Sequence, residues 1–266
     1  MLGLVTSALL AALVAPPAVM MNGLPGAMGR EIAAACLRRG IDLVPYCLTG
    51  PGMPASVTVD DVPGGETRTI EMYPPDKKDE LAARVLADYP DASGVVAIDF
   101  THPTAVNSNA EWYCEHGIPF VMGTTGGDRD ALLATADGSR NYCVIAPNMA
   151  KQIVALQAAL EYMAESYPAA FGGYTLSVTE SHQATKADTS GTAKAIAASL
   201  ASATGAPFGN DQIVKVRETK AQLAGGGESH RGVSPVPDGA LGGHAFHTYS
   251  LVSADGLVEF QARANL

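Results

Sequence analysis

The feature that most constrains this chain is a regular alternation of short apolar runs with helical patterns between residues 18 and 147. The apolar runs carry few polar interruptions, as is typical of strands that are buried on both faces. Strands of this kind that alternate with helices predict a parallel sheet covered by helices on both sides. We expect strands at 18–22, 42–48, 94–100, 118–122 and 142–146, and helices at 30–39, 77–89 and 103–116.

The pattern changes after Pro147. A long helical pattern at 150–165 is followed by isolated strand candidates at 175–180, 212–218, 243–251 and 256–261. This order predicts a second, α+β domain. The stretch 225–243 is rich in Gly, Ser and Pro, which is typical of a surface loop.

Composition excludes several classes of protein. Hydrophobic residues make up 47% of the 266 residues and charged residues 17%, which excludes intrinsic disorder. The net charge is −10, with no compensating basic stripe, so we expect no nucleic-acid partner. Four cysteines without C-x-x-C spacing indicate a reducing compartment, with neither a zinc cluster nor a disulfide framework.

Residues 1–17 form an apolar N-terminal extension with no charged side chain. Pro16 and Pro17 interrupt it well short of the ~20 residues of a membrane helix. It also lacks the basic segment of a secretory signal and the Arg and Ser content of a transit peptide. We therefore expect no membrane anchor.

Three glycines follow the first strand, at positions 23, 26 and 29. Glycines at such a strand-to-helix turn let the backbone approach a pyrophosphate and direct helix N-terminal amides at it. The spacing is looser than G-x-G-x-x-G, so a plain turn without a ligand stays open as an alternative. At the end of the second strand, Leu48 and Thr49 offer no carboxylate that would exclude a 2′-phosphate, and no adjacent arginine that would bind one.

Two further segments end strands of the first domain. Gly123-Thr124-Thr125-Gly126 is a second glycine turn, which either flanks a nicotinamide or is a plain turn. Ala146-Pro147-Asn148-Met149 closes the last strand at the domain boundary. Both lie where ligands bind in parallel sheets, at the carboxyl ends of the strands.

The segment from Glu180 to Ala193 concentrates the chemistry of the second domain. His182 lies on an expected strand, Lys186 lies on the short loop after it, and Ser190-Gly191-Thr192 stands at the start of an expected helix. Hydroxyls and helix-start amides bind a carboxylate, while an imidazole and an ammonium beside them supply a proton. The sequence therefore predicts an acid/base site for an anionic substrate.

We expect no metal site. His244 and His247 are three residues apart on a candidate strand and so point to opposite faces. Cys143 as an acyl-forming nucleophile lacks a neighbouring base and lies in an apolar strand.

These motifs resemble those of the dihydrodipicolinate reductase (4-hydroxy-tetrahydrodipicolinate reductase) family. The resemblance covers residues 18–262 and rests on the glycine turns, Phe100-Thr101, Ala146-Pro147-Asn148, Glu180-x-His182 and Lys186-x-Asp-x-Ser-Gly-Thr192. Residues 119–129, 180–183 and 243–247 resemble the plant-type branch in particular. Gln183 stands where bacterial members commonly have a second histidine, which we interpret as a mark of that branch.

The resemblance implies the fold class α/β: a Rossmann-like parallel-sheet NAD(P)-binding domain at 18–147, then an α+β substrate-binding and oligomerisation domain at 148–266. It implies reduction of 4-hydroxy-tetrahydrodipicolinate, a cyclic dicarboxylate, to tetrahydrodipicolinate by NADPH, with NADH as the alternative. His182 and Lys186 match the family's catalytic groups, and Gln183, Ser190, Gly191 and Thr192 its substrate site. The matching cofactor contacts are Gly23, Gly26, Ala27, Met28, Gly29, Phe100, Thr101, Gly123, Thr124, Thr125, Ala146, Pro147, Asn148 and Met149.

The resemblance further implies a homo-oligomer, a dimer or tetramer, in the plastid; a cytoplasmic location is the alternative. Family members continue past the last strand into a G-R-x-x-Y-A-x-G segment, which residues 262–266 do not contain. Two other functions stay open: an inactive nicotinamide-binding paralogue or truncated gene model, and another two-domain NAD(P)-linked dehydrogenase of a small acid.

Overall fold

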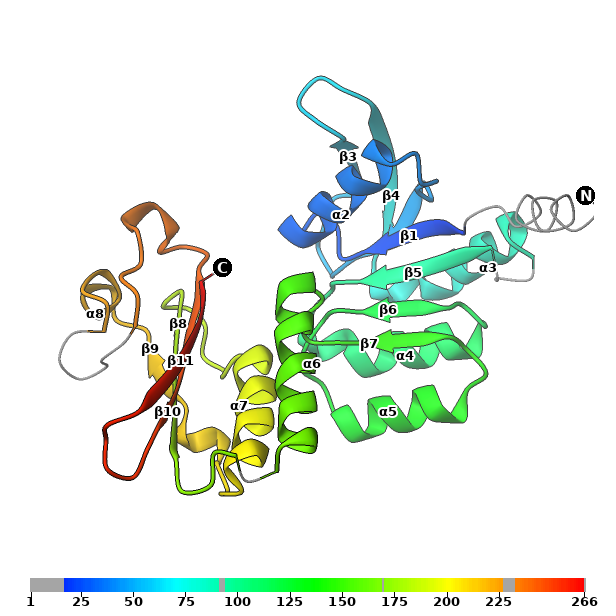
Figure 1. Cartoon of the computed structure of the whole chain (residues 1–266). Helices are drawn as coiled ribbons and strands as arrows, with labels where there is room; N and C mark the ends of the chain where they lie inside the picture. Colours follow the sequence, from blue (N-terminus) through cyan, green and yellow to red (C-terminus); the bar gives the residue numbers. More distant parts are fainter. Residues whose placement is uncertain (1–16, 91–93, 169, 227–232, 266) are drawn as a thin grey trace, which may run out of the picture. The chain divides into compact units, whose positions relative to one another are not determined.

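The chain divides into two compact units, Met1–Pro147 and Asn148–Leu266 (Figure 1). The computed structural model describes residues 17–90, 94–168, 170–226 and 233–265. Residues 1–16 of the expected N-terminal extension and 227–232 of the expected surface loop lie outside the described residues.

The first unit contains the predicted parallel sheet. Its order is β1-β5-β6-β7 and every neighbouring pair is parallel. The strands are β1 (Ala18–Asn22), β5 (Val95–Asp99), β6 (Phe120–Met122) and β7 (Cys143–Ile145). A second sheet, of order β2-β4-β3, comprises β2 (Tyr46–Leu48), β3 (Ser56–Asp60) and β4 (Thr67–Tyr73). A single parallel bridge, Val19 to Leu43, lies between β1 and the segment that leads into β2.

Helices cover both faces of the parallel sheet, which confirms the Rossmann-like class (Figure 1). They are α2 (Ala27–Arg38), α3 (Lys78–Asp88), α4 (Val106–Glu115) and α5 (Arg129–Gly138). Alternate residues of β1 enter different cores, because strand side chains alternate between faces. Ala18 and Met20 belong to the cluster with α3, α4 and α5, whereas Val19 and Met21 belong to the cluster with α2.

Several expected boundaries in this unit are wrong. Helix α2 begins at Ala27, inside the glycine motif, and not at Arg30. The strand expected at 42–48 is reduced to β2 and the bridge at Leu43, because Pro45 between them has no N–H for a ladder. Pro103–Ala105 is a 3₁₀ turn that precedes α4. Strands β3 and β4 and helix α5 were not anticipated.

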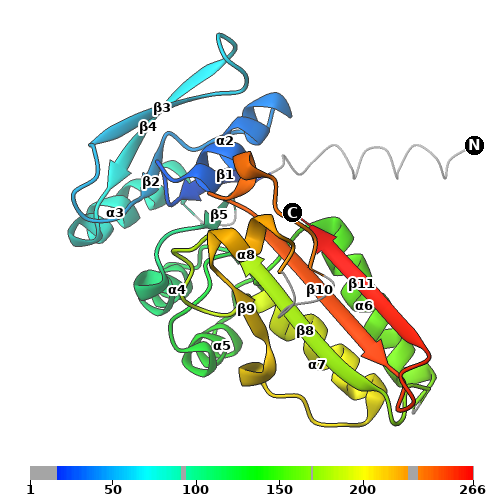
Figure 2. The same cartoon turned by 90° about the vertical axis from the view of Figure 1, so that its left-hand side faces the viewer.

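The second unit is an α+β layer, as predicted. Its sheet has the order β11-β10-β8-β9, with α6 and α7 on one face (Figure 2). The strands are β8 (Thr175–His182), β9 (Val214–Val216), β10 (Ala245–Val252) and β11 (Glu259–Asn265). The helices are α6 (Lys151–Ser166), α7 (Gly191–Thr204) and α8 (Thr219–Leu223). Strand β8 pairs antiparallel with β10 and parallel with β9.

Two strand predictions in this unit need correction. The strand expected at 212–218 shortens to β9, between a 3₁₀ turn at Asn210–Gln212 and helix α8. The last strand runs over Glu259–Asn265 instead of 256–261, because Asp255 and Gly256 form the turn that precedes it. Gly256 has φ +72° there, and Ser253 N–H donates to the carbonyl of Val258 across the turn.

Among the described residues, no helix has both the length and the apolar character to cross a bilayer. Helix α6, with 16 residues, is the longest of them. A membrane helix needs about 20 residues.

Candidate active site

A cavity of about 710 Å³ opens at the carboxyl ends of β1, β2 and β5 in the first unit. This is the edge at which parallel sheets bind ligands, and the volume suits a small molecule or cofactor. Of the predicted cofactor contacts, Gly23, Gly26, Phe100 and Thr101 line it. The other lining residues are Leu24, Pro25, Leu48, Thr49, Gly50, Pro51, Met53, Pro75, Lys78, His102, Thr104, Ala105, Ser108 and Asn109.

The first glycine of the motif has no room for a side chain. Gly23 has φ +101°, and a Cβ built there would lie 2.2 Å from the carbonyl oxygen of Phe100. Its N–H donates to the carbonyl of Leu48 at 3.0 Å, so the turn is held between β5 and β2. Gly26 then precedes the first turn of α2, whose free amides favour an anion. This turn fits the pyrophosphate of a dinucleotide.

A buried carboxylate fixes the two loops behind the cavity. Asp99 is fully buried at the end of β5. Its Oδ1 accepts hydrogen bonds from Thr101 N, Thr101 Oγ1 and Thr124 Oγ1, at 2.8–3.0 Å. Its Oδ2 accepts from Asn109 Nδ2 at 3.0 Å and from the Tyr113 hydroxyl at 2.7 Å. The side chain thus joins the Phe100-Thr101 turn to the Gly123-Thr124 turn.

The lining of the cavity includes a cation that the sequence did not indicate. Lys78, at the start of α3, is the only Lys or Arg among the described lining residues. Its Nζ donates to the Ser108 carbonyl at 3.1 Å, and burial lowers its pKa. Thr49, the predicted ribose-end residue, donates its hydroxyl to the Leu24 carbonyl at 2.6 Å.

The remaining predicted cofactor residues lie outside the described cavity lining. Ala27, Met28 and Gly29 form the first turn of α2. Gly123 packs on the Phe100 ring, since a Cβ there would lie 2.2 Å from its Cζ. Thr125 follows Thr124 in the same turn, and Ala146 and Pro147 follow β7. Asn148 and Met149 belong to the second unit.

We expect Gly23→Ala to weaken binding of a reduced nicotinamide cofactor at least tenfold and to lower the melting temperature. The new methyl group would collide with the Phe100 carbonyl and force the turn to open. The matched control is Gly40→Ala, where φ is +62° but nothing lies within 4 Å. This control variant places an alanine in the left-handed backbone region, with the same conformational cost to stability but without the steric collision. Titration of NADPH fluorescence measures the affinity, and equal affinities of Gly23→Ala and wild type would place the pyrophosphate away from this turn.

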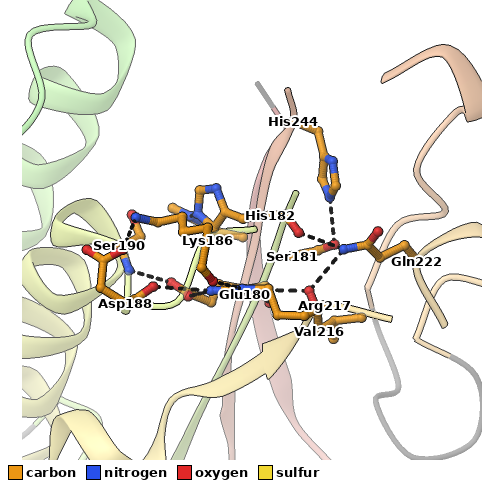
Figure 3. Close-up of polar contacts among 11 residues, drawn as sticks. Glu180, Ser181, His182, Lys186, Asp188, Ser190, Val216, Arg217, Gln222 and His244 are labelled. Atoms are coloured by element: carbon orange, nitrogen blue, oxygen red, sulfur yellow. Dashed lines mark hydrogen bonds and ion pairs between the residues drawn. The ribbon is translucent and has the colours of Figure 1, made fainter. Parts of the chain in front are cut away.

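In the second unit, buried Glu180 organises the predicted acid/base segment (Figure 3). Its Oε1 forms an ion pair with Arg217, and its Oε2 accepts from the Ser190 N–H at 2.9 Å. Glu180 and His182 are two residues apart on β8 and so lie on one face of the sheet. The carboxylate thereby joins the strand that carries His182 to the start of α7.

The loop that carries Lys186 is fixed by polar contacts. Lys186 Nζ forms an ion pair with Asp188 at 2.7 Å, and its carbonyl accepts from Arg217 Nε at 2.9 Å. Its N–H donates to the Gln183 carbonyl at 2.9 Å, which closes a turn directly after β8. The lysine side chain is 23% exposed, so its ammonium group is accessible to a ligand.

Helix α7 begins at Gly191, with Ser190 as its N-cap residue. The Ser190 side chain makes no capping hydrogen bond. The Thr192 hydroxyl accepts from Asn148 Nδ2 at 2.8 Å. Predicted substrate residues Ser190, Gly191 and Thr192 thus form one helix N-terminus, where free amides and the helix dipole favour a carboxylate. Asn148, a predicted cofactor contact, lies against this helix start.

His182 is joined to a second histidine of the neighbouring strand. Its Nε2 lies 3.0 Å from Nε2 of His247, and Nδ1 of His247 lies 3.0 Å from the Tyr249 hydroxyl. Burial lowers the pKa of His182 below its usual value, and burial together with His182 lowers the pKa of His247 to about 4. The His182 carbonyl accepts from Gln222 Nε2 at 2.6 Å.

Glu180, His182 and His247 have ligand atoms within 4.8 Å of one another, a set of types that metal sites use. In this structure the carboxylate oxygens of Glu180 bind protein groups. Both carboxylate oxygens of Glu180 are bonded, one of them to the guanidinium of Arg217. A divalent cation would lie against that positive charge.

The depressed pKa of His247 predicts acid sensitivity. Folding lowers the pKa of His247 from its ordinary value of 6.5. The neutral histidine therefore makes its full contribution to the stability of the folded protein above pH 6.5. This contribution is lost progressively as the pH falls from 6.5 to about 4, because over this interval the unfolded chain takes up the proton and the folded protein does not. From pH 7 to pH 5 we expect the free energy of unfolding of wild type to fall by about 2 kcal/mol more than that of His247→Gln. Urea unfolding at both pH values measures this, and parallel pH curves would contradict it.

Sequence reasoning missed several residues of this site. The Glu180-x-His182 spacing carried a signal for Glu180, because alternate strand residues share a face. His247 was compared with His244, but the structure pairs His247 with His182, and His244 with the Ser181 hydroxyl at 2.8 Å. No sequence pattern indicated Arg217, Gln222 or Tyr249.

Together, the glycine-lined cavity of a parallel-sheet unit and the acid/base cluster of an α+β unit define a two-domain, nicotinamide-dependent oxidoreductase. Residues 18–149 match the family described as "Dihydrodipicolinate reductase, N-terminus". The chain belongs to the 4-hydroxy-tetrahydrodipicolinate reductase family, as the relatives below show.

The relatives extend the match to most of the chain. A probable 4-hydroxy-tetrahydrodipicolinate reductase 2, chloroplastic, of Oryza sativa subsp. japonica is 41% identical over 95% of this chain and 74% of its own length. The chloroplastic enzyme 2 of Arabidopsis thaliana is 42% identical over 93% of this chain and 66% of its own length. The enzyme of Synechocystis is 30% identical over 78% of this chain and 72% of its own. The higher identity to the plant proteins confirms the plant-type resemblance.

A solved structure supports the fold. Dipicolinate-bound dihydrodipicolinate reductase from Paenisporosarcina sp. TG-14 superposes with a TM-score of 0.57 at 18% identity. The superposition covers 95% of this chain and 88% of that one. At this identity the likeness concerns the fold alone.

Proposed function

We propose that this chain reduces 4-hydroxy-tetrahydrodipicolinate to tetrahydrodipicolinate with NADPH, in the diaminopimelate route to lysine. The observation that carries the proposal is the Glu180–Arg217 ion pair, which holds the strand of His182, the loop of Lys186 and the N-terminus of α7 together. The chain also belongs to the family of this reductase. The reaction adds one hydride and one proton to the substrate and releases one water. It therefore needs a hydride donor, a carboxylate site and a proton donor.

The cofactor site is the cavity of the first unit. Gly23 and Gly26 would receive the pyrophosphate, and Phe100 and Thr101 line the same cavity. When bound, NADPH supplies the hydride. Asp99 holds the two turns behind the cavity in place, so they need little reorganisation when the cofactor binds.

The substrate site is the α7 N-terminus with its neighbouring lysine. The amides of Gly191 and Thr192 and the hydroxyl of Ser190 would bind one substrate carboxylate. Lys186 and Gln183 flank them from the turn after β8. An ammonium group beside a helix N-terminus strengthens the attraction for a dianion.

Protonation falls to Lys186 and His182. Lys186 Nζ donates a hydrogen bond to Asp188 Oδ1 at 2.7 Å, and we assign it as the proton donor to the substrate. His182 lies at the end of β8 and is 7% exposed. Among the hydrogen bonds of the described residues, none engages its Nδ1, which leaves that nitrogen for the substrate. Two groups next to the carboxylate site can then hold and transfer the proton.

We expect His182→Gln and Lys186→Ala each to lower kcat by ~10²–10⁴, the range for loss of a positioned proton-transfer group. NADPH affinity should stay near wild type, because neither residue belongs to the cofactor cavity. Lys215→Ala, at an exposed position of β9, is the matched charge control. The assay follows NADPH oxidation with the condensation product of aspartate semialdehyde and pyruvate. Unchanged kcat in both variants would remove them from the mechanism, and no turnover by wild type would favour the inactive paralogue.

We also propose NADPH in preference to NADH. No carboxylate at Leu48 or Thr49 excludes a 2′-phosphate. Lys78 adds a positive charge to the same cavity.

Lys78→Gln should weaken NADPH binding about tenfold, or ~1.4 kcal/mol, and NADH binding less than twofold. Lys77→Gln is the control, because that side chain is 52% exposed and pairs with Glu80. Fluorescence titration of both cofactors against both variants is the measurement. Equal losses for NADPH and NADH would mean that Lys78 meets a part common to the two cofactors.

A homo-oligomer and a plastid location complete the proposal. Strand β11 lies at one edge of its sheet, and its region exposes Leu257, Val258 and Phe260. Exposed apolar groups at a sheet edge favour pairing with another chain. The chloroplastic names of the rice and Arabidopsis relatives support the location.

A further inference from the structure

Two residues of β10, His247 and Tyr249, stand behind His182, and neither was assigned a role in the site from the sequence. In the pairing of β8 with β10, His247 lies opposite Glu180, and Ala245 lies opposite His182. His182, Glu180, His247 and Tyr249 therefore share one face of the sheet. Their side chains form a continuous series from the Tyr249 hydroxyl through His247 to His182.

This series ends inside the protein. Tyr249 is 1% exposed and His247 is 2% exposed, so it has no outlet to water. A proton wire that resupplies His182 from solvent would need such an outlet. The series can instead determine which nitrogen of His182 carries its proton.

The direction of the hydrogen bonds follows from the tyrosine. Burial raises the pKa of Tyr249, so its hydroxyl keeps its proton. Among the described residues, that hydroxyl has Nδ1 of His247 as its hydrogen-bond partner, at 3.0 Å. If the hydroxyl donates to it, neutral His247 carries its proton on Nε2 and donates to Nε2 of His182. His182 must then carry its own proton on Nδ1.

We propose that His247, oriented by Tyr249, is a positioning residue that fixes neutral His182 as the Nδ1–H tautomer and presents this N–H to the ligand. The role parallels that of the groups which orient a catalytic imidazole in other enzymes. The proposal rests on the proposed function in one respect, namely that His182 contacts the substrate. The tautomer itself is a property of the free protein.

Other charged groups surround this pair. Glu180 on β8 favours the charged form of His182, whereas Arg217 and Lys186 disfavour it, as does His244 on the opposite face. Arg217, Lys186 and His182 also disfavour the charged form of His247, and Glu180 favours it. The experiment is therefore done above pH 7.5, where both histidines are neutral and only the tautomer differs.

The test is long-range ¹H–¹⁵N correlation on protein labelled with ¹⁵N-histidine, with His182→Gln to assign the signal. We expect the Nδ1–H pattern for His182 in wild type, and the Nε2–H pattern, which free imidazole favours, in His247→Leu. His247→Gln restores a donor and should recover the wild-type pattern. His244→Leu is the matched control, since His244 is a buried histidine bonded to Ser181 and should leave the pattern unchanged.

Kinetics supply the second readout. His247→Leu should lower kcat about 10–100-fold with unchanged NADPH affinity, as expected when a reacting group is misoriented. His247→Gln should recover most of this loss, and His244→Leu should stay within threefold of wild type. Tyr249→Phe keeps the aromatic ring in the core but removes the hydroxyl, so we expect His182 to populate both the Nδ1–H and the Nε2–H tautomer. This variant tests the proposal if His247→Leu does not fold.

An Nε2–H pattern for His182 in wild type would overturn the proposal, and so would equal kcat losses in His247→Leu and His244→Leu. The tautomer measurement needs no substrate. If the chain turned over no substrate at all, the proposed function would fail while the tautomer proposal could still be decided.

Discussion

The second unit depends on one buried carboxylate, that of Glu180. It is fully buried and binds both the guanidinium of Arg217 and the backbone N–H of Ser190. Because a buried charge without partners is very costly, these three groups must be assembled together. Arg217 in turn bonds the carbonyl of Lys186, so the same ion pair fixes the lysine loop. A strand end, a loop and a helix start thereby acquire fixed mutual positions.

The first unit is held together in the same way. Asp99, also fully buried, ends its strand and accepts five hydrogen bonds from three segments of chain. Its partners are backbone and neutral side chains instead of a cation. In each unit a carboxylate behind the site joins loops to the end of the strand that carries it. The loops are therefore ordered by polar contacts, and their backbone groups stay available to ligands.

Burial also sets the chemistry of the histidine pair. His182 and His247 are joined at 3.0 Å in a region with little solvent, which lowers the pKa of both. A neutral imidazole pair can share one hydrogen bond only if one partner donates and the other accepts. Tyr249 breaks this symmetry, because it contacts one of the two rings. Among the described residues, the ring that keeps a nitrogen without a hydrogen-bond partner is that of His182, at the end of the strand.

The sequence by itself determined the four strands of the parallel sheet and helices α2, α3 and α4 of the first unit, the glycine turn at Gly23 and the helix start at Ser190, but not β3, β4 or α5. These features are local: they depend on spacing within a few residues and on the absence of a Cβ. It did not determine that His247 supports His182, that Arg217 pairs with Glu180, or that Lys78 lines the cavity. His182 and His247 are 65 residues apart and meet only through the register of β8 against β10. A period-two pattern looks the same after a shift of two residues, so this register is decided by tertiary packing.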